Sequence, residues 1–117
     1  MPPASPADPV RVPIHPPLAM ADFEANAALV ADILKAMANQ RRLMVLCRLV
    51  EQGEMTVGDL ADQAGLSQSA LSQHLARMRD EGLVTFRREG QSLWYRIADP
   101  RIETLLATLY QLYCKAN

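Results

Sequence analysis

Two helical patterns that meet at Gly65 and are followed by a hairpin pattern restrict the fold of this chain more than any other feature. Thr56 to Asp59 has the form of a capping box, which predicts a short helix ending at Gly65. Ser67 is a typical N-cap for a longer helix that runs to about Glu81. A short helix, a turn and a longer helix in this order predict a helix-turn-helix.

The segment after Gly82 predicts a two-stranded hairpin. Apolar and polar residues alternate over about 83–88 and again over about 93–97, as in strands with one buried face. Residues 89–92, Glu-Gly-Gln-Ser, form the expected connecting turn. A basic hairpin directly after a helix-turn-helix indicates a wing.

Three further helices are expected around this unit. Asp22 is the expected N-cap of a first helix that runs to about Ala38. A second helix over about 41–51 is apolar nearly all round, which is typical of a helix at the centre of a core. Asp99 and Pro100 predict the N-cap and first residue of a last helix. The predicted fold is therefore mainly α with a small β-hairpin, a winged helix-turn-helix in the order α-α-α-α-β-β-α.

Proline usage predicts the domain boundary. Seven of the eight prolines lie within the first 17 residues, where they prevent a regular helix or a sheet ladder. We expect residues 1–18 to form a disordered tail and residues 19–117 to form one domain. The sequence contains neither a membrane-spanning apolar run nor a secretory signal pattern, so we expect a cytoplasmic protein.

Charge is distributed unevenly along a chain whose net charge is only −1. This balance excludes a basic coat over the whole surface but not a local basic patch. Residues 65–98 hold five arginines against three acidic residues. The basic excess thus coincides with the fourth helix and the hairpin, where a phosphate backbone would lie.

The fourth helix has one apolar and one polar face. Ser69, Ser72 and Gln73 point away from the apolar face and have side chains that hydrogen-bond base edges in a major groove. Ser67 and Gln68 lie in the first turn, where free backbone N–H groups favour a phosphate. The full set of expected DNA-contacting residues is Ser67, Gln68, Ser69, Ser72, Gln73, His74, Arg77, Arg87, Arg88 and Gln91.

Several of these residues have a second interpretation. The polar face of the fourth helix fits a solvated surface as well as a DNA contact. His74 borders the buried seam and is either a half-buried structural residue or a DNA contact. Arg41 and Arg42 fit a solvated helix end or a phosphate contact, and Trp94 fits packing within the hairpin or a stacking platform.

The two cysteines, Cys47 and Cys114, are too few for a disulfide framework and are spaced unlike a zinc site or a CxxC pair. On residue type alone they are either thiol sensors or small buried apolar residues. We expect no metal and no cofactor. The chain also lacks a phosphate loop, a nucleophile elbow and paired catalytic carboxylates, so we do not expect an enzyme.

Two stretches resemble ArsR-type winged-helix transcriptional repressors: Leu34 to Leu43, and Leu66 to Leu75 together with Met78 to Val84. The likeness covers about residues 20–115. It implies a homodimer through the first and last helices that binds double-stranded DNA at an inverted repeat and represses transcription. The cysteines and histidines that metal-sensing members carry on the third and last helices are missing here, so the resemblance does not extend to metal sensing.

The cysteine pair is similar to that of the persulfide-sensing subgroup of this family (BigR, SqrR and HlyU). This similarity implies that Cys47 and Cys114 join through a disulfide or a short polysulfide chain when reactive sulfur species or oxidants rise, and that DNA affinity then falls. The last helix must then pack beside the second. Arg48 and Lys115 follow the cysteines and would favour their thiolates if they point inward. The alternatives are a family regulator without thiol switching and a winged helix that binds another protein.

Overall fold

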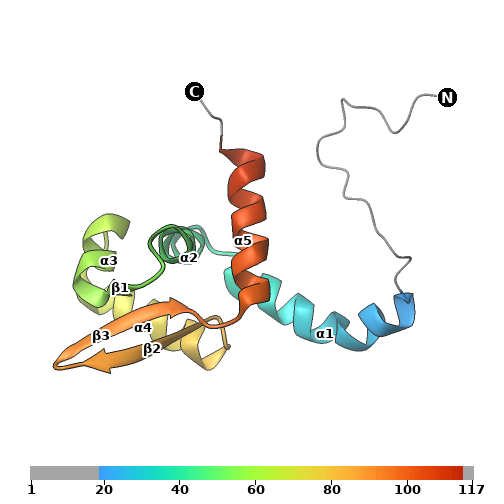
Figure 1. The fold of residues 1–117 in the computed structure, drawn as a ribbon, viewed down its shortest axis with the longest axis horizontal. Coiled ribbons are helices and arrows are strands. Elements are labelled where there is room, and N and C mark those ends of the chain that lie inside the picture. The colour runs from blue at the N-terminus through green and yellow to red at the C-terminus, as the bar shows by residue number, and fades with distance from the viewer. Residues whose placement is uncertain (1–18, 115–117) are drawn as a thin grey trace.

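The computed structural model describes residues 19–114, so the expected tail at residues 1–18 and the last three residues, Lys115 included, lie outside it. Figure 1 shows a mainly helical fold with one small antiparallel sheet. The elements in chain order are α1 (Met20–Met37), α2 (Gln40–Gln52), β1 (Met55–Thr56), α3 (Val57–Ala64), α4 (Gln68–Asp80), β2 (Val84–Glu89), β3 (Ser92–Ile97) and α5 (Pro100–Tyr113). The predicted winged helix-turn-helix is confirmed, with β1 as an added strand.

The predicted caps of three helices are present. Thr56 accepts a hydrogen bond from the backbone N–H three residues later at 3.3 Å, and Ser67 does the same at 3.1 Å. Asp99 accepts one from the N–H two residues later at 2.8 Å, with Pro100 at the start of α5. Gly65 ends α3 in the left-handed conformation, with φ of 67°, which costs glycine less than other residues. Short-range chemistry thus determines where these helices begin and end.

The first helix differs from the prediction at its start. Asp22 is not the N-cap, because α1 begins two residues earlier, after Ala19, and has no side-chain cap hydrogen bond. The Asp22 carboxylate instead lies in the first turn, where it faces the positive end of the helix dipole. Asn39 caps α2 by accepting a hydrogen bond from the Arg42 N–H at 3.1 Å.

The sheet has three strands in the order β1-β3-β2, all antiparallel. The strand β1 was not predicted, because two residues are too short to show an alternating pattern. In the wing, Glu89 pairs with Ser92, which shortens the predicted turn to Gly90 and Gln91. Gly90 has a φ of 61°, as two-residue hairpin turns require.

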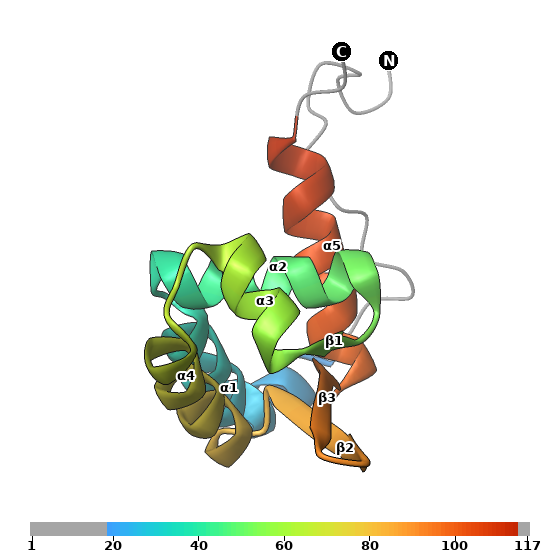
Figure 2. The same cartoon turned by 90° about the vertical axis from the view of Figure 1, so that its left-hand side faces the viewer.

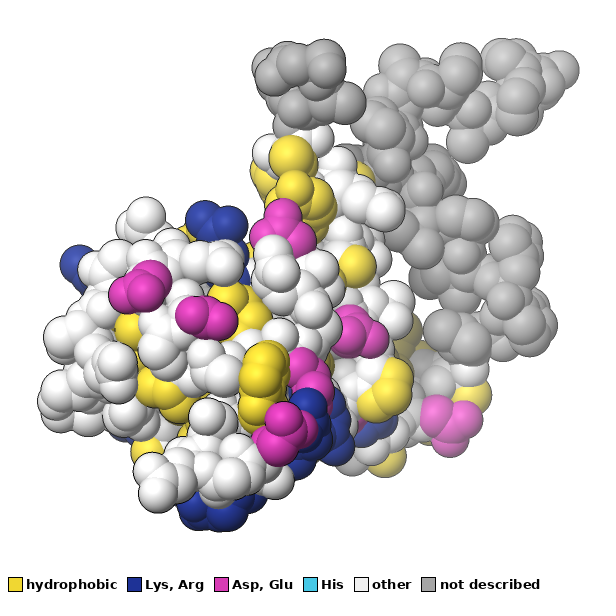
Figure 3. Space-filling view, turned by 60° about the vertical axis from the view of Figure 1, so that its left-hand side comes forward, with side chains coloured by type: hydrophobic (Ala, Val, Ile, Leu, Met, Phe, Trp, Pro, Cys, Tyr) yellow, Lys and Arg dark blue, Asp and Glu magenta, His cyan; other side chains and the backbone are white. Residues whose placement is uncertain are grey.

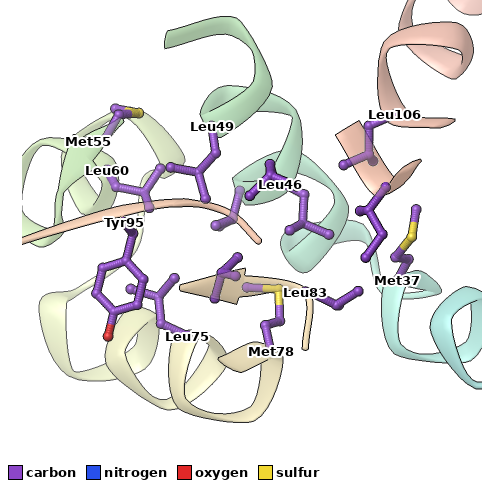
Figure 4. Packing of buried hydrophobic residues seen from close by; sticks show 14 of the residues in the cluster. Met37, Leu46, Leu49, Met55, Leu60, Leu75, Met78, Leu83, Tyr95 and Leu106 are labelled. Carbon is purple, nitrogen blue, oxygen red and sulfur yellow. The ribbon is translucent and has the colours of Figure 1, made fainter. Parts of the chain in front are cut away.

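Helix α2 is central to the core as predicted, but only one of its faces is buried, and Met44 on the other side is 47% exposed. Val45, Leu46 and Leu49 of α2 are fully buried. Figure 4 shows Leu46 and Leu49 among core side chains from the other helices and the sheet. Helices α3 and α5 and strand β3 all pack against α2, and Figure 2 shows α3 and α4 on one side of the body with α5 rising behind it.

Helices α1 and α5 extend away from this body (Figure 1). Only Ala36 and Met37 of α1 are buried, at its C-terminal end. Large apolar side chains are left exposed on both helices: Met20, Phe23, Leu29, Leu34, Tyr110, Leu112 and Tyr113. Within residues 19–114, no helix is long and apolar enough to cross a membrane.

Shortening a buried side chain of α2 should destabilise the fold strongly. Leu46→Ala removes a fully buried side chain, and we expect a loss of about 2–5 kcal/mol in the free energy of unfolding. Urea titration followed by circular dichroism, at one fixed protein concentration, measures this loss. Leu93→Ala, at a half-buried wing position, is the matched control and should cost clearly less. Equal losses for the two variants would contradict the central place of α2.

Candidate DNA interface and cysteine groove

The helix α4 presents the polar face that the sequence predicts. Its apolar residues Leu71, Leu75 and Met78 are buried and fix the orientation of the helix. The side opposite that seam is exposed at Ser67, Gln68, Ser69, Ser72, Gln73 and Arg77. Short hydroxyl and amide side chains on a firmly packed helix have the shape and hydrogen-bonding groups needed to enter a major groove.

His74 makes a contact within the protein. Its Nδ1 accepts a hydrogen bond from Nε of Arg42 at 3.4 Å, while Nη1 of Arg42 donates to the carbonyl oxygen of Ala36 at 3.3 Å. Arg42 therefore joins the end of α1, the start of α2 and helix α4. Burial, followed by the positive charges of Arg42, Arg41 and Arg77, lowers the pKa of His74. These contacts favour the structural interpretation of His74 and give Arg42 a role inside the fold.

Arg87 of the wing is held by two carboxylates. Its Nε lies 3.1 Å from both carboxylate oxygens of Glu54, and its Nη1 lies 2.7 Å from Glu89. The guanidinium also lies over the Trp94 ring, 5.5 Å from the ring centroid, and Arg96 lies 3.9 Å from Glu54. The hydrogen bonds to Glu54 and Glu89 raise the pKa of Arg87. Arg87, an expected DNA contact, is thus engaged in an internal ion-pair cluster, and Trp94 packs against it.

The arginines of the basic segment fall into two groups. Arg79 lies over the Phe86 ring at 5.3 Å and donates to the Tyr95 hydroxyl at 3.4 Å, which ties α4 to the sheet. Arg77 and Arg88 are exposed and have no ion pair with any residue from 19 to 114. Gln91 is exposed at the tip of the wing. Figure 3 shows basic and acidic side chains side by side on one flank and a further basic group at the lower edge.

The two cysteines line one groove between α2 and the end of α5. Cys47 is half-buried on α2, and Cys114 is exposed directly after the last residue of α5. Both are free thiols. The groove has a volume of about 370 Å³, and its other lining residues are Met44, Arg48, Glu51, Tyr110 and Tyr113. The packing of α5 against α2 thus brings together two thiols that are remote in the sequence.

The surroundings of Cys47 do not activate its thiol. Burial raises the pKa of Cys47, which favours the protonated form. Arg48, which would favour the thiolate if it pointed inward, does not offset this effect of burial, and its guanidinium lies 3.6 Å from Glu51. Interaction with Cys114, and then the charge of Glu51, raise the pKa of Tyr110. In the part of the chain that the structure describes, no group of His, Cys, Asp or Glu side chains is arranged to hold a metal.

Comparisons with known proteins agree with this geometry. Residues 39–85 match the sequence profile described as bacterial regulatory protein, arsR family. The transcriptional activator HlyU of Vibrio cholerae is 45% identical over 101 residues, which cover 86% of this chain and 93% of the relative. The crystal structure of the transcriptional repressor BigR from Xylella fastidiosa superposes with a TM-score of 0.76 and 37% identity, covering 85% of this chain and all of that one (100%).

A solution structure of a homodimeric winged helix-turn-helix DNA-binding domain from Mycobacterium bovis is also similar. Its TM-score is 0.68 at 34% identity, and the match covers 85% of this chain and 89% of that one. Relatives of this chain are therefore transcriptional regulators rather than enzymes.

The Arg42–His74 contact predicts a pH-dependent stability. The pKa of His74 is lowered from its ordinary value of 6.5, so the unfolded chain binds this proton more readily than the folded chain. The contribution of neutral His74 is complete above that ordinary value and is lost as the pH falls toward the lowered pKa. Urea unfolding at a series of pH values should show this loss in the wild type and a flatter profile in His74→Gln. Parallel profiles would contradict the prediction.

Proposed function

Because the chain belongs to the arsR family of bacterial regulatory proteins and is a DNA-binding transcriptional regulator, we propose that it is a homodimeric repressor switched by its two cysteines. In the reduced state the dimer binds an inverted repeat. Joining Cys47 and Cys114 through a disulfide or a short sulfur chain lowers the affinity for that operator. The observation that supports this proposal best is that both thiols line one groove between a core helix and an exposed helix.

The exposed apolar faces of α1 and α5 support the homodimer. Both helices extend from the body and leave large apolar side chains uncovered, which is typical of an interaction surface. Figure 3 shows such side chains at the upper end of α5. A two-fold axis between the paired helices of two copies would relate the two α4 helices. If these lie about 34 Å apart, which is one turn of DNA, each can enter one of two adjacent half-sites.

Within each half-site, α4 would supply base contacts and its surroundings would supply phosphate contacts. Ser72 and Gln73 lie on the exposed face that would enter the major groove. Ser67 and Gln68 lie at the helix N-terminus, where backbone N–H groups favour a phosphate. Arg77 and Arg88, together with Gln91 at the wing tip, would reach the backbone beside the groove.

The switch would act by tying α5 to the core. Cys114 lies at the end of α5, whereas Cys47 belongs to the central helix α2. A disulfide requires Cα atoms within about 7 Å, and a longer sulfur chain tolerates a wider gap. The exposed Cys114 would react first, since the raised pKa of the half-buried Cys47 slows the attack of its thiol. Moving the dimer helices would misplace the two α4 helices, and a tenfold loss of affinity needs only about 1.4 kcal/mol.

DNA titration of cysteine variants tests the switch. The probe is an operator duplex selected by the reduced protein from a randomised library, and binding is followed by fluorescence anisotropy. Treatment with sulfide plus an oxidant should weaken binding by the wild type at least tenfold but leave Cys47→Ser and Cys114→Ser unchanged. Mass spectrometry should show the loss of two hydrogens for a disulfide, or the same loss together with the gain of one or two sulfur atoms for a polysulfide bridge between the thiols. A response that survives in Cys47→Ser would identify a regulator without this switch.

Neutralising Arg77 and Arg88, which have no ion pair with any residue from 19 to 114, tests the DNA interface against a protein-interaction role. Arg77→Gln and Arg88→Gln should each weaken DNA binding and reduce the slope of log affinity against log salt concentration by about 0.9 for each lost phosphate contact. Arg48→Gln has the same change in charge but lies in the cysteine groove, so it should leave the slope unchanged. If the wild type binds DNA with no salt dependence, or all three variants behave alike, the assigned interface is wrong.

A further inference from the structure

The carboxylate that holds the wing arginine has a consequence for DNA affinity. We propose that Glu54 is a positioning residue that competes with the DNA backbone for Arg87 and so limits the affinity of the wing for phosphate. This inference rests on DNA binding through the wing and is independent of the cysteine switch.

The geometry of the pair resembles that of a guanidinium on a phosphate. Nε of Arg87 lies 3.1 Å from both carboxylate oxygens of Glu54, and Nη2 lies 3.0 Å from one of them. Nη1 is occupied by Glu89 at 2.7 Å. Planar two-pronged recognition of this kind is the mode by which arginine also binds phosphate. A phosphate that binds Arg87 in this two-pronged way, through Nε and Nη2, must therefore displace the Glu54 carboxylate from the same donor groups.

The cluster also removes charge from the wing. Arg87 and Arg96 face Glu54 and Glu89, so two positive charges meet two negative ones and the cluster has no net charge. Two of the five arginines between residues 65 and 98 are thereby withdrawn from the long-range attraction of DNA. Arg88, next to Arg87 in β2, points to the other side of the strand and has no carboxylate partner within residues 19–114.

The backbone fixes Glu54 in this position. It follows Gly53, the residue that ends α2, and it precedes β1. The pairing of β1 with β3 sets Thr56 opposite Trp94, and continuing that register places Glu54 opposite Arg96. The side chain of Arg87 is 44% exposed, so DNA reaches the pair from solvent. Exposed ion pairs are weak enough to exchange partners when a phosphate arrives.

Replacing Glu54 by its uncharged isostere tests the proposal. The full-length protein is kept reduced, and the probe is a random-sequence duplex of about three helical turns. Glu54→Gln should bind this duplex about three- to tenfold more tightly at low salt, with a slope against log salt concentration steeper by about 0.9 for each phosphate gained. Glu51→Gln removes the same charge from α2, where its partner is Arg48, and should change neither quantity appreciably.

Two further variants separate competition from a general charge effect. In an Arg87→Gln background, Glu54→Gln should lose most of its gain, because the released arginine is absent. Glu89→Gln, at the exposed end of β2, should give a smaller gain in the same direction without touching β1. Thermal melts confirm that each variant is folded.

Three results would overturn the proposal. The first is a gain for Glu54→Gln no larger than that for Glu51→Gln, and the second is a gain that persists in full without Arg87. The third is weaker binding by Glu54→Gln, which would make Glu54 a support for the wing instead of a competitor. Because the protein stays reduced and the duplex has no operator, none of these results depends on the cysteine switch. Failure of the wild type to bind any duplex would instead contradict DNA binding itself.

Discussion

The burial of one face of α2 is the contact on which the rest of this molecule depends. Val45, Leu46 and Leu49 form the centre of the core, and three neighbouring elements pack on them. The same helix places the residues with the most specific contacts. Arg42 near its start reaches the recognition helix, Cys47 in its middle lines the groove beside α5, and Glu54 lies just beyond its end beside the wing.

Several charged side chains of α4 and the wing, the elements proposed to contact DNA, make contacts within the fold. Arg42 is bound to His74, Arg79 spans from α4 to the sheet, and Arg87 is bound to carboxylates. Only part of the basic excess of residues 65–98 is therefore available to phosphates. Attraction to the phosphates of DNA does not depend on base sequence, so a fully available basic surface would bind all DNA sites with similar affinity. A smaller available charge suits a regulator that must release DNA.

The sequence predicts the elements whose causes are local. Thr56, Ser67 and Asp99 are caps because a short side chain reaches an N–H two or three residues ahead, and that relation is visible in the order of residues. Asp22 misled the prediction because several positions in a first turn suit an acidic residue, and here α1 begins without a side-chain cap. The strand β1 has too few residues to show a period and exists because β3 pairs with it.

Contacts between distant residues explain what sequence reasoning missed at the site. The Glu54–Arg87 pair joins residues 33 apart, and the Arg42–His74 pair joins residues 32 apart. No rule of sequence spacing predicts such pairs. The sequence therefore predicts neither the ion pairs of Arg87 nor a role for Glu54. The approach of Cys114 to Cys47 also depends on helix packing, and the sequence suggested it only through resemblance to a family.

In the proposed homodimer, the weak attachment of α1 to its own chain would make the order of this helix depend on protein concentration. An 18-residue helix that buries only its last residues has little to hold it in an isolated copy, since most of the stability of a helix in a protein comes from the packing of its apolar face. A second copy would supply the missing contacts. At low protein concentration, chains would then be single copies with a frayed α1. The concentration at which pairing orders α1 would set the threshold at which the regulator begins to act.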